Sequence, residues 1–315
     1  MKAVLQYRAS AGFREALADR APAWLTTVVV PEDDKARFAD EMRDADALLH
    51  VLEPVTAAVM AAAPRLRLIQ KLGVSVNTID LEAARQRGIF VANMPGTNSQ
   101  AVAEATLALM LAVLRRVPWL DSETRAGRGW SLESDTFDSV GEIHGRTVGL
   151  VGYGEVPRRL APVLIALGAG VIVHSRTRHA DALGRWCELD ALLAEADIVS
   201  LHLPLNADTQ GLIGRDAIAR MKPGAILVNT ARGGLVNEAA LVQGLRSGHI
   251  AAAGLDVFSS EPVNTDNALL ELRNVVVMPH AAWLTPETLE RSLGIAFENC
   301  ARIKDGRELL HQMAP

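Results

Sequence analysis

The chain has 315 residues, a formal net charge of −5, 49% hydrophobic residues and 22% charged residues. That balance is typical of an ordinary globular protein and excludes a largely disordered chain. The slight acidity gives no electrostatic reason to expect a nucleic-acid or anionic-membrane partner. The length is sufficient for two domains of ordinary size.

The N-terminal segment and the cysteines favour a cytoplasmic protein. The opening residues, MKAVLQYRASAGFREAL, lack the apolar run of a secretory signal. Cys187 and Cys300 lie far apart, form no metal-type pair and are expected to be reduced thiols. The most apolar stretch, from Ala101 to Val117, contains Glu104 and is slightly short for a membrane span, so it predicts a buried or interface helix. We therefore expect no metal and no membrane partner.

In the first third of the chain, short β-branched runs alternate with helical patterns. The predicted strands are Ala3–Gln6, Leu25–Val30, Ala47–Val51, Leu68–Lys71 and Phe90–Ala92. The predicted helices between them are Phe13–Ala21, Glu32–Arg43, Thr56–Ala62 and Leu81–Arg87. This alternation indicates a small, doubly wound parallel α/β domain.

The segment that follows reads as a connection between domains. Proline and glycine in NMPGT, residues 93–97, break the pattern and predict a hinge. A long helix is predicted from Ser99 to about Val117, and its apolar surface predicts a two-fold homodimer built across it. The polar, glycine-containing stretch DSETRAGRGWSLESDTFDS, residues 121–139, predicts a loop.

A second α/β unit opens at Arg146. Its predicted strands are Thr147–Val151, Val171–His174, Ile198–Leu201, Ile226–Asn229, Ala251–Leu255 and Val275–Met278. A final helix is predicted from Pro286 to about Lys304. Because the first domain lacks a closing helix, we expect this one to pack back against it. The predicted domains are 1–97 plus 285–315, and 98–284, both of them doubly wound parallel α/β sheets.

The second unit opens with a dinucleotide-binding pattern. A strand ends at Val151, Gly152-Tyr153-Gly154 forms a tight turn, and a helix starts at Glu155 and Val156. Such a turn lets the backbone approach a pyrophosphate, which the free N–H groups of the helix N-terminus stabilise. Pro157 stands in place of the usual third glycine, which a first helical turn tolerates. The alternative is a degenerate turn that no longer binds a cofactor.

The end of the next strand predicts which nucleotide is bound. An NAD-preferring site has Asp or Glu there to accept hydrogen bonds from the ribose hydroxyls. Here Ser175 takes that position, followed by Arg176, Thr177 and Arg178. Hydroxyl and guanidinium groups would bind a 2′-phosphate that a carboxylate would repel. NADP(H) is therefore expected to be preferred, with NAD(H) as a possible second cofactor. The alternative is a solvated basic turn.

Four longer segments carry a resemblance that covers nearly the whole chain. They are KLGVSVNTIDLEAARQRGIFVANMPGTNSQAVAEATLALML from Lys71, MKPGAILVNTARGGLVNEAAL from Met221, GLDVFSSEP from Gly254 and MPHAAWLTPET from Met278. In this order they resemble the D-isomer-specific 2-hydroxyacid dehydrogenases. The resemblance implies a flavodoxin-like substrate domain, a Rossmann cofactor domain and a homodimer.

The resemblance places three catalytic residues at Arg232, Glu261 and His280. Reduction of a ketone builds negative charge on oxygen, so a proton donor must be at hand, and His280 can supply the proton near neutral pH. Glu261 beside it would favour the imidazolium form and fix the ring tautomer. Arg232 can bind the substrate carboxylate and polarise the carbonyl.

The resemblance also implies further binding residues. The backbone N–H groups of a glycine-rich loop in the family bind the substrate carboxylate, and Ser75 here replaces a common glycine of that loop. The expected substrate-binding residues are Leu52, Val74, Ser75, Val76 and Trp283. Those expected beside the nicotinamide are Thr230, Ala231 and Asp256.

The function expected from these features is NADPH-dependent reduction of small 2-keto acids such as glyoxylate and hydroxypyruvate. D-3-phosphoglycerate dehydrogenase is the nearest alternative. Two features make that alternative less favoured. His50 stands where such enzymes often carry a phosphate-binding arginine, and the chain stops at Pro315 without a regulatory extension. A nucleotide-sensing binding protein of the same fold is an alternative from another class.

Overall fold

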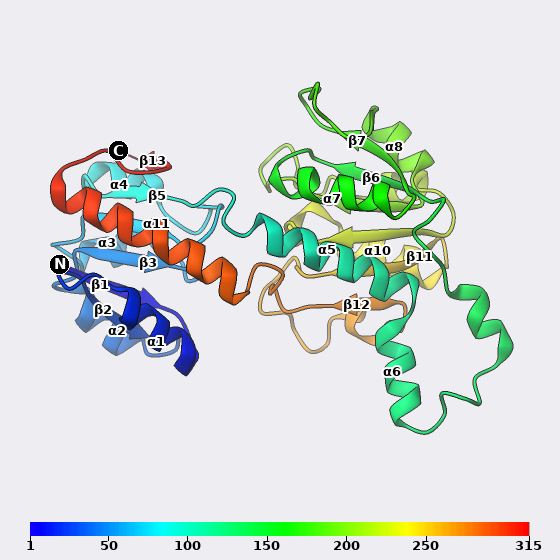
Figure 1. Ribbon diagram of the computed structural model, residues 1–315, viewed down its shortest axis with the longest axis horizontal. Coiled ribbons are helices and arrows are strands. Elements are labelled where there is room, and N and C mark those ends of the chain that lie inside the picture. Colours follow the sequence, from blue (N-terminus) through cyan, green and yellow to red (C-terminus); the bar gives the residue numbers. More distant parts are fainter. Residues whose placement is uncertain (315) are drawn as a thin grey trace. The chain divides into compact units, whose positions relative to one another are not determined.

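A computed structural model of the chain describes residues 1–314 and is drawn in Figure 1. The chain divides into two compact units. Unit 1 comprises Met1–Asn98 and Thr285–Pro315, and unit 2 comprises Ser99–Leu284. Each unit is an α/β structure built on one sheet, as the sequence predicts.

Unit 1 contains a six-stranded sheet in the order β13-β5-β4-β3-β1-β2. All its neighbours pair in parallel except β13, which runs antiparallel to β5. The strands are β1 (Lys2–Gln6), β2 (Thr26–Val30), β3 (Ala47–His50), β4 (Leu68–Lys71), β5 (Phe90–Ala92) and β13 (Gln312–Ala314). The helices are α1 (Ala11–Arg20), α2 (Lys35–Met42), α3 (Ala57–Ala61), α4 (Leu81–Gln86) and α11 (Pro286–Asp305). The parallel part has the flavodoxin-like strand order.

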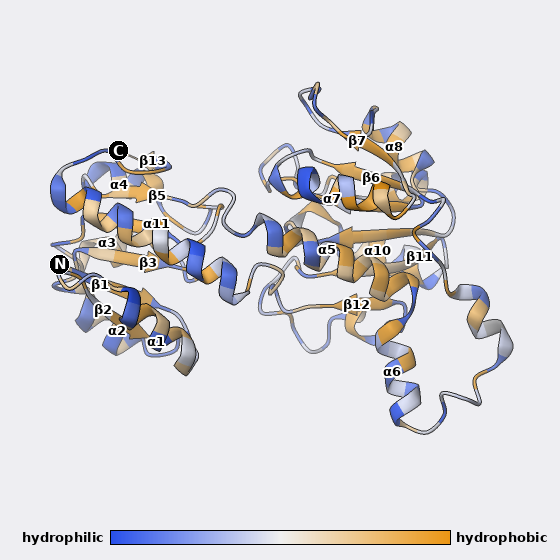
Figure 2. Ribbon diagram, viewed as in Figure 1, coloured by the Kyte–Doolittle hydropathy of each residue, from blue (hydrophilic) through white to orange (hydrophobic). Residues whose placement is uncertain are grey.

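Local sequence explains these elements. Every residue of β3 and β4 is buried, which is the pattern of a parallel strand covered on both faces. Each of these five helices follows a residue whose side chain accepts the N–H group three residues later: Ser10, Asp34, Thr56, Asp80 and Thr285. The strands of both sheets are apolar and the helices carry polar stretches, as Figure 2 shows.

Unit 2 contains a seven-stranded sheet in the order β12-β11-β10-β9-β6-β7-β8. Its strands are β6 (Thr147–Val151), β7 (Gly170–His174), β8 (Arg185–Trp186), β9 (Ile198–Leu201), β10 (Ala225–Asn229), β11 (Ile250–Leu255) and β12 (Val275–Val277). Its helices are α5 (Ser99–Leu114), α6 (Val117–Arg125), α7 (Glu155–Ala166), α8 (Leu189–Glu195), α9 (Arg215–Arg220) and α10 (Glu238–Arg246). This is the order of a Rossmann sheet extended by one strand, and it reverses between β6 and β9. The fold class predicted from the sequence is confirmed.

Alternating side chains of the central strands supply two apolar layers, one on each face of this sheet. Val148 of β6 and Val228 of β10 belong to the layer that includes residues of α5 and α7. Val151 of β6 and Leu227 of β10 belong to the other layer, with residues of α8, α9 and α10. The period of two places both helix layers directly against strands. The sheet is thereby fixed, and so are the loops at its carboxyl edge.

The long helix predicted from Ser99 to about Val117 ends earlier than expected. α5 stops at Leu114, because Arg116 adopts left-handed backbone angles with φ at 52°. A new helix, α6, begins at Val117 with Pro118 in its first turn, a position proline tolerates. The loop predicted for residues 121–139 is therefore partly wrong. It contains the end of α6 and a 3-10 helix, Ser134–Ser139.

The apolar character of α5 has an explanation within unit 2. Leu109, Met110 and Val113 are buried in a layer shared with α7 and the strands. Burying one such side chain contributes about 1.5–3 kcal/mol. Within residues 1–314, no helix combines the length and the apolar character needed to cross a bilayer.

Candidate active site

The three residues predicted to be catalytic all follow strands at the carboxyl edge of the unit 2 sheet. Arg232 comes after β10, Glu261 after β11 and His280 after β12. These strands are neighbours in the sheet, and open α/β sheets place their sites at this edge. Topology therefore brings the three segments to one place within unit 2.

His280 and Glu261 form a hydrogen-bonded pair. The ring Nδ1 lies 2.5 Å from Glu261 Oε2, and the two side chains are 24% and 32% exposed. The second carboxylate oxygen, Oε1, accepts the Phe258 N–H group at 2.9 Å, which holds the carboxylate in place. Among residues 1–314, His280 Nε2 has no hydrogen-bond partner. The pair thus fixes the ring and leaves its other nitrogen available for proton transfer.

The surroundings of Glu261 and Arg232 act on their pKa values in opposing ways. Burial raises the pKa of Glu261. Hydrogen bonds from His280 and Phe258 and the charges of His280 and Arg232 lower it by a larger amount, so the pKa of Glu261 lies below its usual range. Burial lowers the pKa of Arg232, and the Glu261 charge partly offsets this. The carboxylate therefore stays ionised beside Arg232 and the His280 ring.

Asp256 holds the segment that carries His280. Its Oδ1 and Oδ2 accept the N–H groups of Ala281 and Ala282 at 2.8 and 3.1 Å, and its carbonyl accepts the His280 N–H group at 2.8 Å. Burial raises the pKa of Asp256, and these two N–H groups act against that rise. Trp283 Nε1 donates to the His280 carbonyl at 3.0 Å. The carboxylate predicted to contact the nicotinamide is thus also a clamp, and the nicotinamide contact stays a prediction.

A tight turn positions Arg232. Asn229 closes it from both sides, because its Oδ1 accepts the Ala231 N–H group and its Nδ2 donates to the Arg232 carbonyl. A Cβ at Gly233 would lie 1.9 Å from the Phe258 carbonyl carbon, so only glycine permits this approach to the Glu261 segment. Sequence reasoning did not select Asn229, although a buried asparagine at a strand end is a signal for a side-chain-closed turn.

Thr230, predicted to line the nicotinamide pocket, forms a side-chain hydrogen bond with a threonine of α5. Its hydroxyl lies 2.8 Å from the hydroxyl of Thr106 on α5, and Thr106 in turn donates to the Val102 carbonyl. Both threonine side chains are buried. Thr106 is a second residue that the sequence analysis did not identify, because nothing in its helical position shows which strand end it will meet.

The glycine turn after β6 fits a dinucleotide. Gly152 has a φ of 100°, and a Cβ there would lie 2.4 Å from the His202 carbonyl oxygen, so the turn requires glycine. Open space surrounds Gly154. Among residues 1–314, the N–H groups of Glu155 and Val156 at the start of α7 have no acceptor. Such groups at a helix N-terminus are suited to a pyrophosphate.

Pro157 is the third residue of α7 and is buried. The first residues of a helix have no intrahelical acceptor, so proline costs no hydrogen bond at this position. The replacement of the usual glycine is therefore compatible with a regular helix start. It leaves the cradle at the N-terminus of α7 with one N–H donor fewer.

The segment after β7 presents one unengaged cation. Ser175 is buried, and its hydroxyl donates to the Thr177 carbonyl at 2.7 Å. The Arg178 guanidinium lies 3.9 Å from the centre of the Trp186 ring, a cation–π arrangement. Arg176 is exposed and has no ion pair or hydrogen bond from its side chain among residues 1–314. The Ser175 hydroxyl, expected to donate to a phosphate, is instead used inside the loop in this conformation.

Tyr153 ties the glycine turn to the loop that follows β7. Its hydroxyl accepts the Leu183 N–H group at 2.7 Å, and the Arg158 guanidinium lies 5.1 Å from the ring centre. Arg158 also pairs with Asp181 and lies 3.2 Å from His179 Nδ1. The side chain of Tyr153, predicted to bind cofactor, thus has a structural partner. Sequence reasoning missed Arg158, and its spacing carried no signal for these contacts.

The predicted substrate residues of unit 1 follow two neighbouring strands. Leu52 comes after β3, and the loop Val74–Val76 comes after β4. Leu52 and Val74 are exposed, and the N–H groups of all three loop residues have no acceptor among residues 1–314. His50 is buried below them. Its Nδ1 has no partner there, and burial and then the Lys71 charge lower its pKa to about 3.

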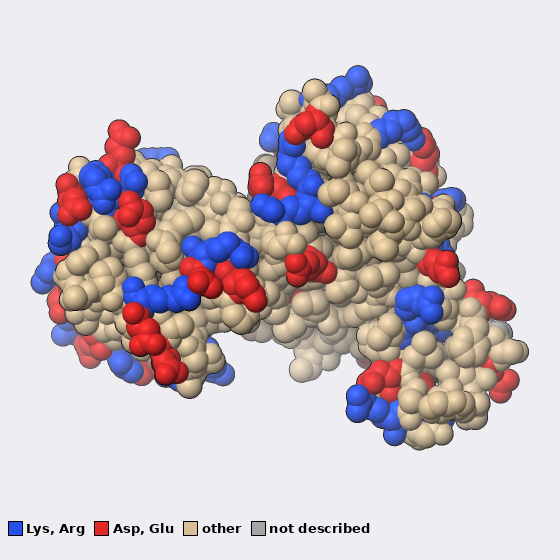
Figure 3. Space-filling view, in the orientation of Figure 1, with Lys and Arg blue, Asp and Glu red and all other residues tan. Residues whose placement is uncertain are grey.

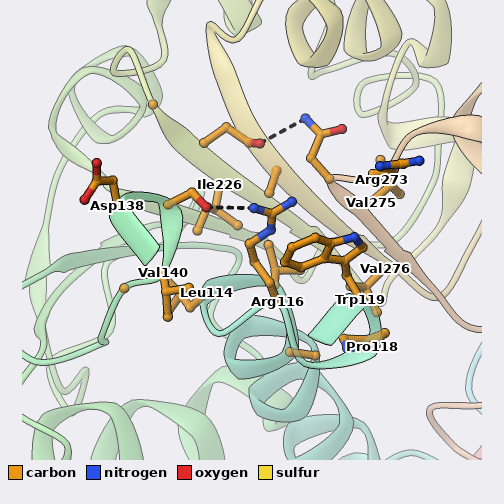
Figure 4. Close-up of a pocket in the computed structure, with 18 of the residues that line it drawn as sticks. Leu114, Arg116, Pro118, Trp119, Asp138, Val140, Ile226, Arg273, Val275 and Val276 are labelled. Atoms are coloured by element: carbon orange, nitrogen blue, oxygen red, sulfur yellow. Dashed lines mark hydrogen bonds between the residues drawn. The ribbon is translucent and has the colours of Figure 1, made fainter. Parts of the chain in front are cut away.

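A groove of unit 2 lies at the opposite, amino edge of the sheet. It has a volume of about 610 Å³ and is lined by the ends of α5, the start of α6, residues 138–141 and the first residues of β10, β11 and β12. Figure 4 shows Arg116 and Trp119 beside Val275 and Val276 in this groove. Because catalytic chemistry in such sheets belongs to the carboxyl edge, we do not assign the reaction to it.

Together, a glycine turn at the strand-order reversal and an acid–base pair at the same edge define a dinucleotide-dependent enzyme. Residues 107–282 match the family described as D-isomer specific 2-hydroxyacid dehydrogenase, NAD binding domain. A glyoxylate reductase of Aeropyrum pernix is 42% identical over 273 residues, which cover 84% of this chain and 82% of that protein.

A D-3-phosphoglycerate dehydrogenase of Mycobacterium bovis is 43% identical over 267 residues, and the match covers 83% of this chain. It covers only 49% of that longer protein. Among solved structures, the TT0316 protein of Thermus thermophilus covers 100% of both chains with a TM-score of 0.90 and 36% identity. The chain belongs to the D-isomer specific 2-hydroxyacid dehydrogenases, so it is an oxidoreductase with a dinucleotide-binding domain.

Proposed function

We propose that this protein reduces small 2-keto acids, such as glyoxylate and hydroxypyruvate, with NADPH as the preferred cofactor. The observation that carries the proposal is the His280–Glu261 pair, whose free Nε2 stands at the same sheet edge as Arg232. Unit 2 is the proposed dinucleotide domain, and unit 1 is the proposed substrate domain.

Each residue of the site has a distinct part in this chemistry. When bound, the reduced nicotinamide supplies the hydride. His280 holds the proton at Nε2 and gives it to the substrate oxygen as negative charge develops there. Glu261 keeps the ring oriented and favours its protonated form, because it accepts from Nδ1. Arg232 binds the substrate carboxylate and polarises the carbonyl with its planar set of donors.

The proposed carboxylate site of unit 1 favours small substrates without a phosphate. Three unpaired N–H groups, those of Val74, Ser75 and Val76, can bind one carboxylate. His50, which follows Leu49 in β3, is buried, and its low pKa keeps the ring neutral, so it offers no cation to a phosphate.

The substrate proposal is tested by comparing catalytic efficiencies. The purified protein should show a higher kcat/KM for glyoxylate and hydroxypyruvate than for 3-phosphohydroxypyruvate. A higher value for the phosphorylated acid would favour the alternative, D-3-phosphoglycerate dehydrogenase. That alternative has support from the 43% identity to the mycobacterial enzyme.

The cofactor proposal rests on Arg176, the unengaged cation after β7. A hydrogen bond to a charged group contributes about 1.5–3 kcal/mol, so one good contact with a 2′-phosphate means about tenfold or more in affinity. Arg176→Ala should remove most of the preference for NADPH and hardly change NADH binding. Arg178→Ala is the matched control, because Arg178 is stacked on Trp186 and should have the smaller, more salt-sensitive effect.

A second variant tests the same proposal from the other direction. Ser175→Asp introduces the ribose acceptor of an NAD site and a charge that repels a phosphate, so it should reverse the preference. The measurement is the ratio of Michaelis constants for NADH and NADPH. Equal constants in the unmodified protein would mean that Arg176 belongs to a solvated turn.

We also propose a homodimer. The apolar side chains of α5 are mostly buried within unit 2. In the segment that follows α5, Val117, Phe137 and above all Trp130, which is 91% exposed, present apolar side chains to solvent. Contiguous apolar patches mark interaction surfaces, and the proposed interface includes these three side chains. Light scattering at micromolar protein should give the mass of a dimer, and a stable monomer would contradict the proposal.

On the face shown in Figure 3, acidic and basic side chains are interspersed and do not form one extended patch of a single sign. A mixed surface of this kind gives no long-range attraction for a polyanion.

A further inference from the structure

The loop proposed to bind the substrate carboxylate, residues 74–76, offers backbone N–H groups as donors. The direction of these donors depends on how their peptide planes are held. Among residues 1–314, the N–H groups of Val74, Ser75 and Val76 all lack an acceptor. Unpaired backbone donors in a loop can rotate toward water or toward other acceptors, unless the peptide planes are held from behind. The residues that hold those planes therefore determine whether the loop binds an anion.

Two adjacent peptide planes of this loop are fixed by the segment that follows β5. The Gly73 carbonyl accepts the Met94 N–H group at 2.9 Å, and the Val74 carbonyl accepts Asn93 Nδ2 at 2.8 Å. In a trans peptide the carbonyl and the next N–H group point in opposite directions. Fixing these two carbonyls on one side therefore directs the N–H groups of Val74 and Ser75 to the other side together.

Asn93 is itself held in a buried polar chain. The carbonyl of Asn93 accepts Gln70 Nε2 at 3.4 Å, and its N–H group donates to the His311 carbonyl at 3.1 Å. Behind it, Asn299 Nδ2 of α11 donates to Gln70 Oε1 at 2.6 Å. Gln70 and Asn299 are fully buried and Asn93 is nearly so. Buried polar groups bonded in this way are rigid, so the amide that holds Val74 has a fixed position.

We propose that Asn93 is a positioning residue for substrate binding: its side-chain amide, supported by Gln70 and Asn299, orients the N–H donors that receive the substrate carboxylate. The inference rests on the proposed function of the loop and deepens it. Asn93 does not touch the substrate. It acts by setting the direction of the Val74–Ser75 peptide, and it is the first residue of the predicted hinge, residues 93–97.

Two variants remove the amide donor of Asn93 and differ in their effect on packing. Asn93→Ala leaves a space, and Asn93→Leu keeps a similar volume, but neither can donate to the Val74 carbonyl. Both should raise the KM for glyoxylate and the inhibition constant of oxalate by about tenfold or more, the effect of losing one charged hydrogen bond. The dissociation constant of NADPH should stay unchanged, and kcat should fall less than KM rises.

A matched control separates positioning from stability. Gly88, between α4 and β5, has a φ of 64°, and an added Cβ there would meet no atom within 4 Å, so Gly88→Ala strains the backbone of the same unit without touching the loop. It should lower Tm without changing the KM for glyoxylate. If the Asn93 variants matched the unmodified protein in both constants, or if KM, kcat and NADPH affinity declined together with Tm, the proposal would be overturned.

Direct binding keeps this test apart from the proposed reaction. Calorimetric titration of oxalate into the NADPH-loaded enzyme measures carboxylate binding without turnover. If the unmodified protein did not reduce glyoxylate, the proposed substrate would be wrong. Weaker oxalate binding in both Asn93 variants would still support the positioning role, and unchanged oxalate binding would refute it.

Discussion

Glu261→Gln tests the acid–base pair most sharply, because it removes one negative charge and keeps the side-chain shape. In the proposed reduction the His280 ring gives a proton to the substrate oxygen, so activity is expected to fall as the pH rises. Glu261 favours the protonated form of the ring. The variant should therefore lose activity at a lower pH than the unmodified enzyme.

The expected size follows from the geometry. The contact between His280 Nδ1 and Glu261 Oε2 is 2.5 Å long, and a hydrogen bond to a charged group contributes about 1.5–3 kcal/mol. Because 1.36 kcal/mol corresponds to a factor of ten, losing the whole contribution would lower kcat/KM by about ten- to a hundredfold. Both side chains are partly exposed, and solvent screening places the expected loss near the lower end, about tenfold.

The amide of the variant also cannot replace both oxygens. Glu261 accepts from His280 with one oxygen and from the Phe258 N–H group with the other. A glutamine offers one acceptor and one NH₂ group, so one of the two N–H donors must face another donor. We therefore expect kcat to fall as well, in addition to the shift in pH dependence.

The assay is kcat/KM for glyoxylate between about pH 5 and pH 9. Glu238→Gln is the matched control, because that carboxylate also accepts a backbone N–H group, that of Ser259, but has no hydrogen bond with His280. An unshifted profile in Glu261→Gln, or an equal shift in Glu238→Gln, would refute the assigned role of the pair.

Three further predictions concern single positions. His280→Asn should reduce turnover by about 10²–10⁴-fold while NADPH still binds in a fluorescence titration, and near-normal turnover would remove His280 from the mechanism. Gly233→Ala places a Cβ 1.9 Å from the Phe258 carbonyl carbon, so it should destabilise the protein by about 1–3 kcal/mol or more and abolish activity; an unchanged Tm would contradict the close approach. For His50, burial lowers the pKa in the folded state to about 3, below the ordinary value near 6.5. The neutral His50 ring therefore contributes its full stability above pH 6.5, and this stability is lost as the pH falls toward 3. His50→Gln should reduce the loss of unfolding free energy between pH 7 and pH 5, by up to about 1.4 kcal/mol per pH unit in urea titrations, and an unchanged slope would contradict a neutral buried ring.

Much of the fold could be predicted from the sequence, because buried parallel strands are short apolar runs. β4 and β9 match their predicted ranges, since every residue in them is buried. The break at Arg116 could not be predicted, because left-handed backbone angles at an arginine depend on tertiary packing. β8 and β13 have only two and three residues, too few for a periodic pattern.

The sequence could predict that some candidate site residues lie together, but it could not predict most of their hydrogen-bond partners. A motif indicates that Glu261 and His280 act together, and the structure adds the Phe258 N–H group that fixes the carboxylate. No spacing rule shows that the Ser175 hydroxyl donates to the Thr177 carbonyl, because this depends on how one loop turns. The role of Asn93 was missed for a similar reason: its amide reaches a loop that lies about twenty residues earlier in the chain.

The order of elements along the chain has a consequence for how the protein is made. Unit 2 occupies one continuous stretch, Ser99–Leu284. Unit 1, in contrast, needs α11 and β13, which are synthesised after unit 2. Domains generally fold as units during synthesis. The dinucleotide-binding unit can therefore complete its sheet first, while β5 still lacks its antiparallel neighbour. Asn299 and the Leu310 segment that it bonds can support the proposed carboxylate loop only once residues 285–314 have been synthesised, so unit 1 is completed after unit 2.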